Sequence, residues 1–256
     1  MSLSGRLDVI FAEQLRNHPE GHALYNKVSA DHLKPGTCGF FDEKGDWNVI
    51  EQLCDRETWE SDGWIGIPEQ LRTETDFGIQ WPVKLSESAK GYEIDVDVNL
   101  KPPISGGINI AFKSSENVGA VLITDPPVER KRLKRDLPAL DWVLQNTRKL
   151  LDHWPEILSR GLWIVTKTYS VKRCANAVLT AKDDEAKISI QASIPDVANA
   201  VPSATWWKQG SHGSWNIYTD DSGIVVFMSG IQCKVGLVRR SKVRKTTRYV
   251  QRTFKR

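Results

Sequence analysis

The most regular hydrophobic pattern in the chain is a ten-residue alternation of apolar and polar side chains. Every second residue of Tyr92–Lys101 is apolar, and Pro102-Pro103 end the run. The alternation resumes at Ile108, Ile110 and Phe112, after a glycine-rich stretch. Successive side chains of a strand point to opposite faces, so this pattern predicts two amphipathic strands around a turn.

A second pair of strands is predicted further along the chain. Residues 162–172 are rich in β-branched and aromatic side chains, and alternation then continues to Ala181. After a charged turn at residues 182–185, apolar residues alternate with polar ones from Ile188 to Ile194. Residues 162–195 are therefore predicted to hold a second amphipathic strand pair.

Shorter strands are predicted toward both ends. Thr37–Phe41 and Asp46–Ile50 flank a polar turn and indicate a hairpin. Trp215–Thr219 and Ile224–Val238 predict two more strands. The second of these is almost continuously apolar, which is typical of a central strand.

Two segments show helical spacing instead. Residues 3–15 place apolar side chains three or four residues apart, with Ser2 or Ser4 as a cap. Residues 129–160 begin with a basic cluster and predict a basic amphipathic helix that Gly161 ends. Its apolar stripe is Leu140, Leu144, Thr147, Leu151, Trp154 and Leu158. This order of elements predicts an α+β fold with a twisted mixed or antiparallel sheet and flanking helices.

The charge of the chain is divided between an acidic body and a basic C-terminal segment. Lys234–Arg256 carry ten of the 35 Lys and Arg residues and no acidic residue. Residues 1–233 therefore hold 25 basic residues against 32 acidic ones. We expect residues 1–236 to form the folded domain and 237–256 to be a flexible basic tail. Such a tail is suited to an anionic polymer or an acidic lipid surface.

Motifs for catalysis or metal binding are not apparent. The four cysteines are scattered and the five histidines lie apart, and the sequence lacks the glycine-rich phosphate-binding loops and nucleophile motifs of common enzymes. Asp95 and Asp97 share one strand face, but such pairs are usually solvated rather than catalytic. We therefore expect no enzyme activity, no catalytic residues, no metal and no cofactor. Two other binding functions stay open: a nucleic-acid-binding protein that uses the basic tail, and a tryptophan-rich carbohydrate-binding β-domain.

Taken in order, the segments resemble the N-terminal pore-forming domain of gasdermins, and they are most similar to the single-domain fungal members. Three stretches carry the resemblance. They are Gly45–Leu53 after the first hairpin, Leu150–Val171 where a helix leads into a strand, and Trp215–Gly236.

The resemblance implies a cytoplasmic protein that binds acidic phospholipids at the inner leaflet of the plasma membrane. Protomers would oligomerise, and each would refold residues 78–124 and 162–195 into two β-hairpins of a transmembrane barrel. The outcome would be lytic programmed cell death, as in fungal heterokaryon incompatibility. Because no C-terminal inhibitory domain is expected after this chain, the resemblance implies a divergent homologous protein as the activating partner, and no nucleic acid.

The same resemblance assigns two sets of residues. The lipid-binding set is Arg6, Arg16, Arg130, Lys131, Arg132, Lys134, Arg135, Lys234, Arg239, Arg240, Lys242, Arg244, Lys245 and Arg248. The membrane-inserting set is Tyr92, Ile94, Val96, Val98, Leu100, Ile108, Ile110, Phe112, Trp163, Val165, Ala177, Leu179, Ile188, Ile190 and Ile194. The polar side chains between them would line an acidic lumen.

Overall fold

The computed structural model describes residues 6–55, 63–66, 71–96, 106–192, 204–206, 215–235 and 243–246. The helices in these ranges are α1 (Leu7–Gln14), α3 (Leu137–His153) and α4 (Ile157–Arg160). The strands are β1 (His22–Ala23), β2 (Thr37–Phe41), β3 (Trp47–Gln52), β4 (Thr73–Ile79), β5 (Lys84–Leu85), β6 (Ala89–Val96), β7 (Gly106–Ser114), β8 (Gly119–Thr124), β9 (Val128–Leu133), β10 (Leu162–Leu179), β11 (Glu185–Ala192), β12 (Ala204–Trp206), β13 (Trp215–Val235) and β14 (Val243–Thr246). The fold is α+β, as predicted, and the strand pairings within these ranges are all antiparallel.

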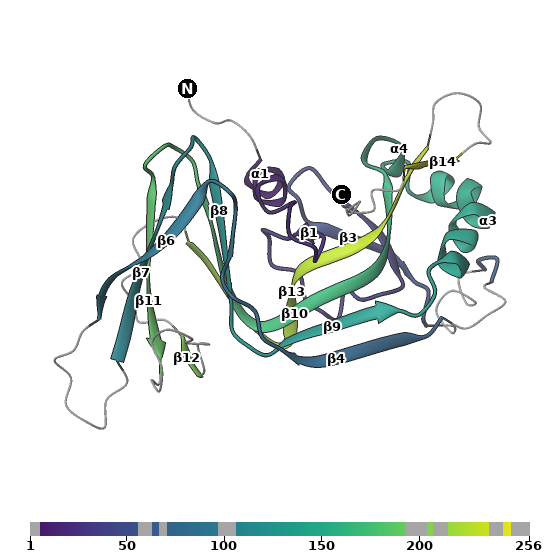
Figure 1. Ribbon diagram of the computed structural model, residues 1–256. Helices are drawn as coiled ribbons and strands as arrows, with labels where there is room; N and C mark the ends of the chain where they lie inside the picture. Colours follow the sequence, from purple (N-terminus) through teal and green to yellow (C-terminus); the bar gives the residue numbers. More distant parts are fainter. Residues whose placement is uncertain are drawn as a thin grey trace, which may run out of the picture.

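Two long strands, β10 and β13, run antiparallel through the larger sheet (Figure 1). β10 pairs in turn with β2, β9 and β8 along its other edge, while β13 also pairs with β1 and β14. Their register shifts three times between Val165 and Arg173. Each such bulge bends a strand and increases its twist. The pair therefore curves strongly, as Figure 1 shows. One end lies beside β8, and the other end lies beside β2 and β14.

A single strand replaces one predicted pair. The sequence predicts separate strands at Trp215–Thr219 and Ile224–Val238, whereas β13 is continuous from Trp215 to Val235. The charged residues between the two predicted segments stay within the strand because β10 pairs with both of its halves. Pairing with the long strand β10 thus keeps β13 continuous across a polar stretch that the local sequence would predict to be a turn.

The predicted pairing within residues 162–195 is wrong. β10 and β11 follow each other in the chain, but β11 pairs with β7 and β12. A strand has only two edges, and those of β10 near this end are already taken by β13 and β8. β11 therefore turns away into a second sheet, whose order is β12-β11-β7-β6.

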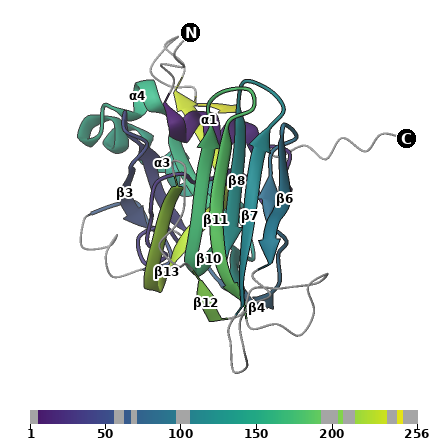
Figure 2. The ribbon, with the colours of Figure 1, turned by 90° about the vertical axis from the view of Figure 1, so that its left-hand side faces the viewer.

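The second sheet packs face to face on the end of the first, as Figure 2 shows. A buried cluster fills the space between them: Ala89, Phe112, Val121, Ile123, Ala175, Ala177, Leu179, Ala186 and Ile188. On the other face of β8 and β10, Phe11 and Leu15 from α1 and its C-cap join a second buried cluster. The β8–β10 layer is thus covered on both faces, which explains why every residue of β8 is buried.

The basic cluster does not belong to a helix. The sequence predicts a basic helix from residue 129, but Val128–Leu133 form β9, which pairs with β10 on one edge and β4 on the other. The helix α3 begins only at Leu137, next to Pro138, a residue suited to the first turn of a helix. The amphipathic period of the leucines therefore predicts the helix but not its start.

The buried face of α3 also differs from the predicted stripe. Leu140 is buried as expected, whereas Leu144 and Leu158 are about half exposed. Trp142 takes the central position, with its ring centroid 5.2 Å from that of Trp64. The bulk of this tryptophan sets the rotation of the helix about its axis, and Val143 turns inward in place of Leu144.

The start of α1 lies later than predicted, because its N-cap is Arg6 and residues 1–5 fall outside the described ranges. Part of the predicted flexible tail is a strand, since β14 pairs with the end of β13. Of the helices in the described ranges, none has the length and apolar character needed to cross a membrane.

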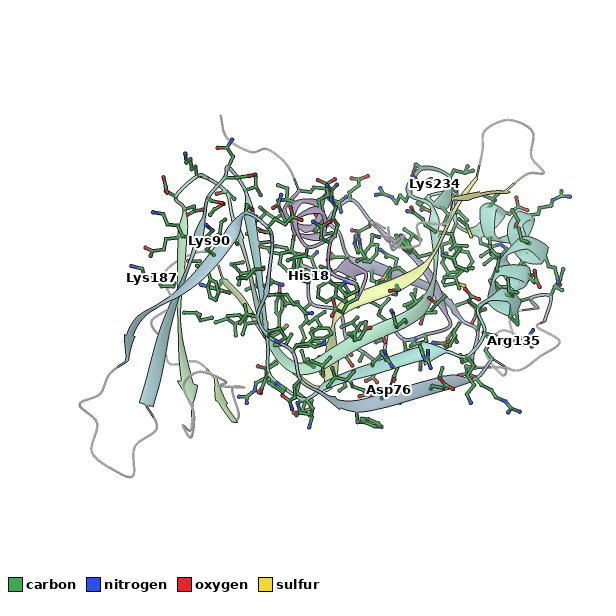
Figure 3. All side chains as sticks on the ribbon, in the orientation of Figure 1. His18, Asp76, Lys90, Arg135, Lys187 and Lys234 are labelled. Carbon is green, nitrogen blue, oxygen red and sulfur yellow. The ribbon has the colours of Figure 1, made fainter. Side chains whose placement is uncertain are left out.

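A buried ion pair joins the segment after α1 to β5. Lys84 Nζ lies 2.7 Å from Glu20 Oε1, and both side chains are about one-tenth exposed. Lys84 also lies over the ring of Trp81, and the His18 ring contacts the carbonyl oxygen of Leu85 at 3.0 Å. Figure 3 places His18 near the centre of the molecule. These contacts fasten the segment after α1 to β5, which pairs with β8.

Replacing one member of this ion pair leaves a buried charge without its counter-ion. We expect Lys84→Met to lower the free energy of unfolding by about 3 kcal/mol. The double variant Glu20→Gln/Lys84→Met removes that charge and should recover most of the loss. Urea denaturation of both variants measures the difference. Equal stability of the single and double variants would contradict a charge-based role for the pair.

Candidate functional site

A large groove lies between α1, the β2–β3 hairpin and the middle of the β10–β13 pair. Its volume is about 1150 Å³. The floor includes Thr166 and Lys167 of β10 and Met228–Gln232 of β13, and the walls include one face of α1 and the end of β9. The bend of the two long strands brings these elements together, although they are far apart in the sequence.

Six cationic side chains line this groove. They are Arg6, Arg16, Arg132, Lys134, Arg160 and Lys167. Four of them belong to the predicted lipid-binding set, so the structure gathers residues that the sequence places more than 100 positions apart. Asp8, Glu13 and Asp136 also line the groove, which leaves cations in the majority.

Four of the groove cations have carboxylate partners, and one of them is Lys134, which lies near Glu74 of β4. Arg6 pairs with Asp8, and it also donates to the carbonyl oxygen of Asp42 at 3.1 Å. Arg160 lies 2.7 Å from Glu43 at the tip of the β2–β3 hairpin. Arg132 is held by a carboxylate of β4. These pairs fix the rim of the groove.

Arg16 and Lys167 are the cations available to a ligand. No carboxylate among the described residues lies within ion-pair distance of either one. The ammonium of Lys167 lies 5.4 Å from the ring of Tyr169, a cation–π contact that leaves its hydrogen-bond donors open. A guanidinium and an ammonium without counter-ions, lining one groove, suit a phosphate or carboxylate group.

Aromatic rings line the same groove beside these cations. The ring of His22 lies 5.7 Å from Phe41 and 5.9 Å from Trp163. Phe41 in turn packs on Trp47 at 5.0 Å. Trp163 is only partly buried, so it presents an apolar surface with a polar edge. Such side chains favour the boundary between water and lipid.

The predicted basic cluster forms a strip along β9 and just after its end, called here the basic strip: Arg130, Lys131, Arg132 and Lys134. The last two of these residues also line the groove. The cations of the basic strip are paired. Arg130 lies 2.6 Å from Asp76, and Arg132 lies 2.7 Å from Glu74. Lys134 lies 3.3 Å from Glu74, and Lys131 lies 2.7 Å from Glu129. Figure 3 shows Asp76 at the outer edge of the sheet.

The pairing shifts the pKa of Glu74 and the pKa of Arg130. Hydrogen bonds from Lys134 and Arg132 hold the pKa of the Glu74 carboxyl below its ordinary value. The hydrogen bond to Asp76 raises the pKa of the Arg130 guanidinium. The first shift bears on stability at acid pH, because a carboxyl with a lowered pKa stabilises the fold only while it is ionised.

We expect the contribution of Glu74 to stability to depend on pH in one direction. It is fully present above the ordinary glutamate pKa of about 4.3 and is lost as pH falls through the lowered pKa of the folded state. Glu74→Gln should therefore be less stable than the parent chain at pH 7, and the difference should shrink steadily below about pH 4. Urea denaturation over this range measures it. A difference that grows on acidification would contradict the ion-pair geometry.

The other predicted lipid-binding residues lie elsewhere. Arg135 is exposed beside α3, and Lys234 is exposed at the end of β13, opposite Arg244 of β14 in register (Figure 3). Lys245 pairs in register with Cys233. Arg239, Arg240, Lys242 and Arg248 lie outside the described residues. The structure therefore divides the predicted set between the groove, the basic strip and the β13–β14 end.

Four of the predicted membrane-inserting residues lie in the two-layer packing. Phe112, Ala177, Leu179 and Ile188 are fully buried between the sheets. Six further members belong to the strands β6, β7 and β11: Tyr92, Ile94, Val96, Ile108, Ile110 and Ile190. Trp163 and Val165 lie at the other end of β10, beside the groove. Val98, Leu100 and Ile194 fall outside the described residues.

Sequence reasoning missed four residues that matter here. Lys167 interrupts an apolar run and Arg160 ends a helix, and both patterns were visible without indicating a groove. The alternation of Glu74 and Asp76 in β4 matches the alternation of Arg132 and Arg130 in β9. That complementarity could have been found by comparing the two segments.

Comparisons with known proteins give limited results. No family model and no curated protein matches the chain. Among solved structures, it is similar to a bacterial gasdermin from Bradyrhizobium tropiciagri, with 11% identity over 87% of this chain and 85% of that one and a TM-score of 0.34. It is also similar to the Gasdermin A3 membrane pore seen by cryo-EM, with 12% identity over 92% of this chain and 94% of that one and a TM-score of 0.34.

Both structures belong to the family that the sequence resembles. A TM-score of 0.34 nevertheless carries no argument about what this chain does. The function therefore has to be inferred from the groove, the basic strip and the two β-layers. Chemically, the cations of the groove suit an anion. Among the residues that the structure describes, no group of three or more His, Cys, Asp or Glu could hold a metal ion.

Proposed function

We propose that the chain is a pore-forming protein. It binds acidic phospholipids, assembles with other copies and inserts two β-hairpins per protomer into a transmembrane barrel, with lytic cell death as the outcome. It rests in the cytoplasm and acts at the inner leaflet of the plasma membrane. A divergent homologous protein would be the activating partner, and no enzymatic activity is expected.

The convergence of cations on one groove is the observation that carries this proposal. Arg6 and Arg16 come from the α1 region, Arg132 and Lys134 from the β9 region, and Lys167 from β10. Each cation close to an anionic bilayer contributes about 1 kcal/mol of attraction. Several such residues around one groove, two of them without counter-ions, favour an anionic headgroup over a neutral one.

The two-layer packing supports the insertion step. The strands of both predicted membrane segments pair with each other, β8 with β10 and β7 with β11. Their apolar faces are buried in one shared cluster. β7 is nine residues long, within the range of about 9–11 residues that a tilted strand needs to cross a bilayer. Opening the two layers would release amphipathic strands of suitable length.

Dye release from vesicles tests the proposal. We expect release from vesicles of phosphatidylcholine with phosphatidylserine and none from phosphatidylcholine alone. Arg16→Gln/Lys167→Gln removes the two groove cations without counter-ions. It should raise the concentration needed for release by roughly tenfold or more, since each charge is worth about 1 kcal/mol.

The matched control is Lys34→Gln/Arg148→Gln, which changes the net charge equally but away from the groove and from both predicted membrane segments. Arg148 is almost fully exposed on α3, and Lys34 is exposed just before β2. An equal loss in both double variants would show that only overall charge matters. Failure to bind or permeabilise acidic vesicles, together with tight binding to a single-stranded oligonucleotide, would overturn the proposal in favour of nucleic-acid binding.

A further inference from the structure

The acidic strand β4 lies directly along the basic strip of β9. The two strands pair antiparallel, with Glu74 opposite Arg132 and Asp76 opposite Arg130. Residues two apart in a strand share a face, so both carboxylates meet both guanidinium groups on the same side of the sheet. The basic strip therefore has an anionic occupant that belongs to the chain itself.

β4 is weakly anchored to the rest of the fold. None of its seven residues is buried, and the described residues give it a single strand partner, β9. The register breaks between Asp76 and Ile79, where Gly78 has a φ of 78°. Phe77 beside it is 76% exposed, unusually so for a large aromatic side chain. Ile79 at its end packs against the buried cluster that contains Phe11 and Leu15. Backbone pairing and exposed ion pairs are the attachments of Thr73–Asp76, the part of β4 that lies along the basic strip.

Removing β4 would change the charge of the basic strip. With β4 in place, the four cations face three carboxylates, those of Glu74, Asp76 and Glu129. Without β4, only Glu129 remains. The strip would then present three unpaired cations on one edge of the sheet, and the edge of β9 would be open.

We propose that β4 is a displaceable internal counter-strand: it occupies the basic strip in the resting protein, and an acidic phospholipid surface takes its place. This inference rests on the proposed function and names how its lipid-binding surface is regulated. Exposed ion pairs between flexible side chains add little stability. A bilayer that presents many headgroups at once can therefore compete with two carboxylates.

Phe77 gives the released strand a second use. In the resting protein the ring lies in water, where it contributes nothing to packing. Aromatic side chains are favoured at the boundary between headgroups and acyl chains. Once β4 leaves β9, Phe77 can enter that boundary while the basic strip holds headgroups. Displacement then replaces the ion pairs between β4 and β9 by two kinds of membrane contact: headgroups on the basic strip and the ring of Phe77 at the lipid boundary.

A charge-neutral β4 tests the inference. Glu74→Gln/Asp76→Asn frees Arg130, Arg132 and Lys134 without touching any groove cation that lacks a counter-ion. We expect binding to phosphatidylserine-containing vesicles to become at least fivefold tighter, since even one freed cation that reaches a headgroup is worth about a factor of five. Co-sedimentation with these vesicles measures the change.

The matched control is Asp31→Asn/Asp152→Asn, which raises the net charge by the same two units. Both aspartates are exposed, and neither belongs to β4, β9 or a predicted membrane segment. An equal gain in binding for this control would overturn the inference, because it would show an effect of net charge alone. Tighter binding of the β4 variant to a single-stranded oligonucleotide, without tighter binding to vesicles, would also overturn it.

Hydrogen exchange without lipid keeps this test separate from pore formation. In Glu74→Gln/Asp76→Asn, exchange of the amides of residues 73–79 should accelerate by a larger factor than that of β10 and β13, because local release of β4 adds to any loss of global stability. This readout does not require any membrane activity. If the β4 variant shows faster exchange and tighter vesicle binding but no variant releases dye, the proposal that β4 is displaceable is supported and the proposal of a pore is contradicted. If the parent chain releases dye but the β4 variant matches it in exchange and binding, the counter-strand is contradicted.

A reversible lock tests whether β4 must move. Thr75 and Lys131 are register partners on the face opposite the ion pairs. We expect oxidised Thr75→Cys/Lys131→Cys to bind acidic vesicles at least fivefold more weakly than its own reduced form, which controls for the lost lysine. Equal binding of the two forms would show that the strand stays in place.

Discussion

Val121, Ile123 and Leu179 in one β-layer pack against Phe112 and Ile188 in the other, and the rest of the structure depends on this contact. The strands that make it are amphipathic, and neither layer could bury its apolar face alone. β10 reaches both the layers and the groove because bulges bend it along its length. The same strand, β10, therefore takes part both in the packing that buries the apolar strand faces and in the groove that the cations line.

Electrostatics divides the surface into two kinds of basic site. Arg16 and Lys167 line a groove without counter-ions, whereas the basic strip is neutralised by Glu74, Asp76 and Glu129. An anionic surface would meet the first site at once and the second only by displacing β4. Contact in two stages would let a weakly charged body approach a membrane before its strongest basic surface is exposed. The buried pair Glu20–Lys84 acts on a different boundary, between the N-terminal segment and the β-layers.

Local pattern predicted the elements better than their partners. The alternation of residues 108–112 lies within β7, and that of residues 92–101 overlaps β6, which begins at Ala89, while residues 97–101 lie outside the described ranges. The first hairpin was predicted within one or two residues at each end. The basic residues of β9 were assigned to a helix, because charged side chains fit either structure and the deciding partners, β4 and β10, are distant in sequence. The same holds for β11, whose partner is set by the occupied edges of β10. The groove lay beyond prediction, since it exists only through the bend of two long strands.

The central claim is that the apolar faces buried between the layers turn toward lipid. A small fluorophore attached to a cysteine at Ile188, compared with one at the neighbouring Lys187, tests it in a chain whose half-buried Cys54 is replaced by Ser. Ile188 points into the layer interface, whereas Lys187 is partly exposed. On acidic vesicles with quenchers in the acyl chains, the account predicts strong quenching at position 188 and little at 187. Absence of quenching at 188 while the vesicles leak would contradict it.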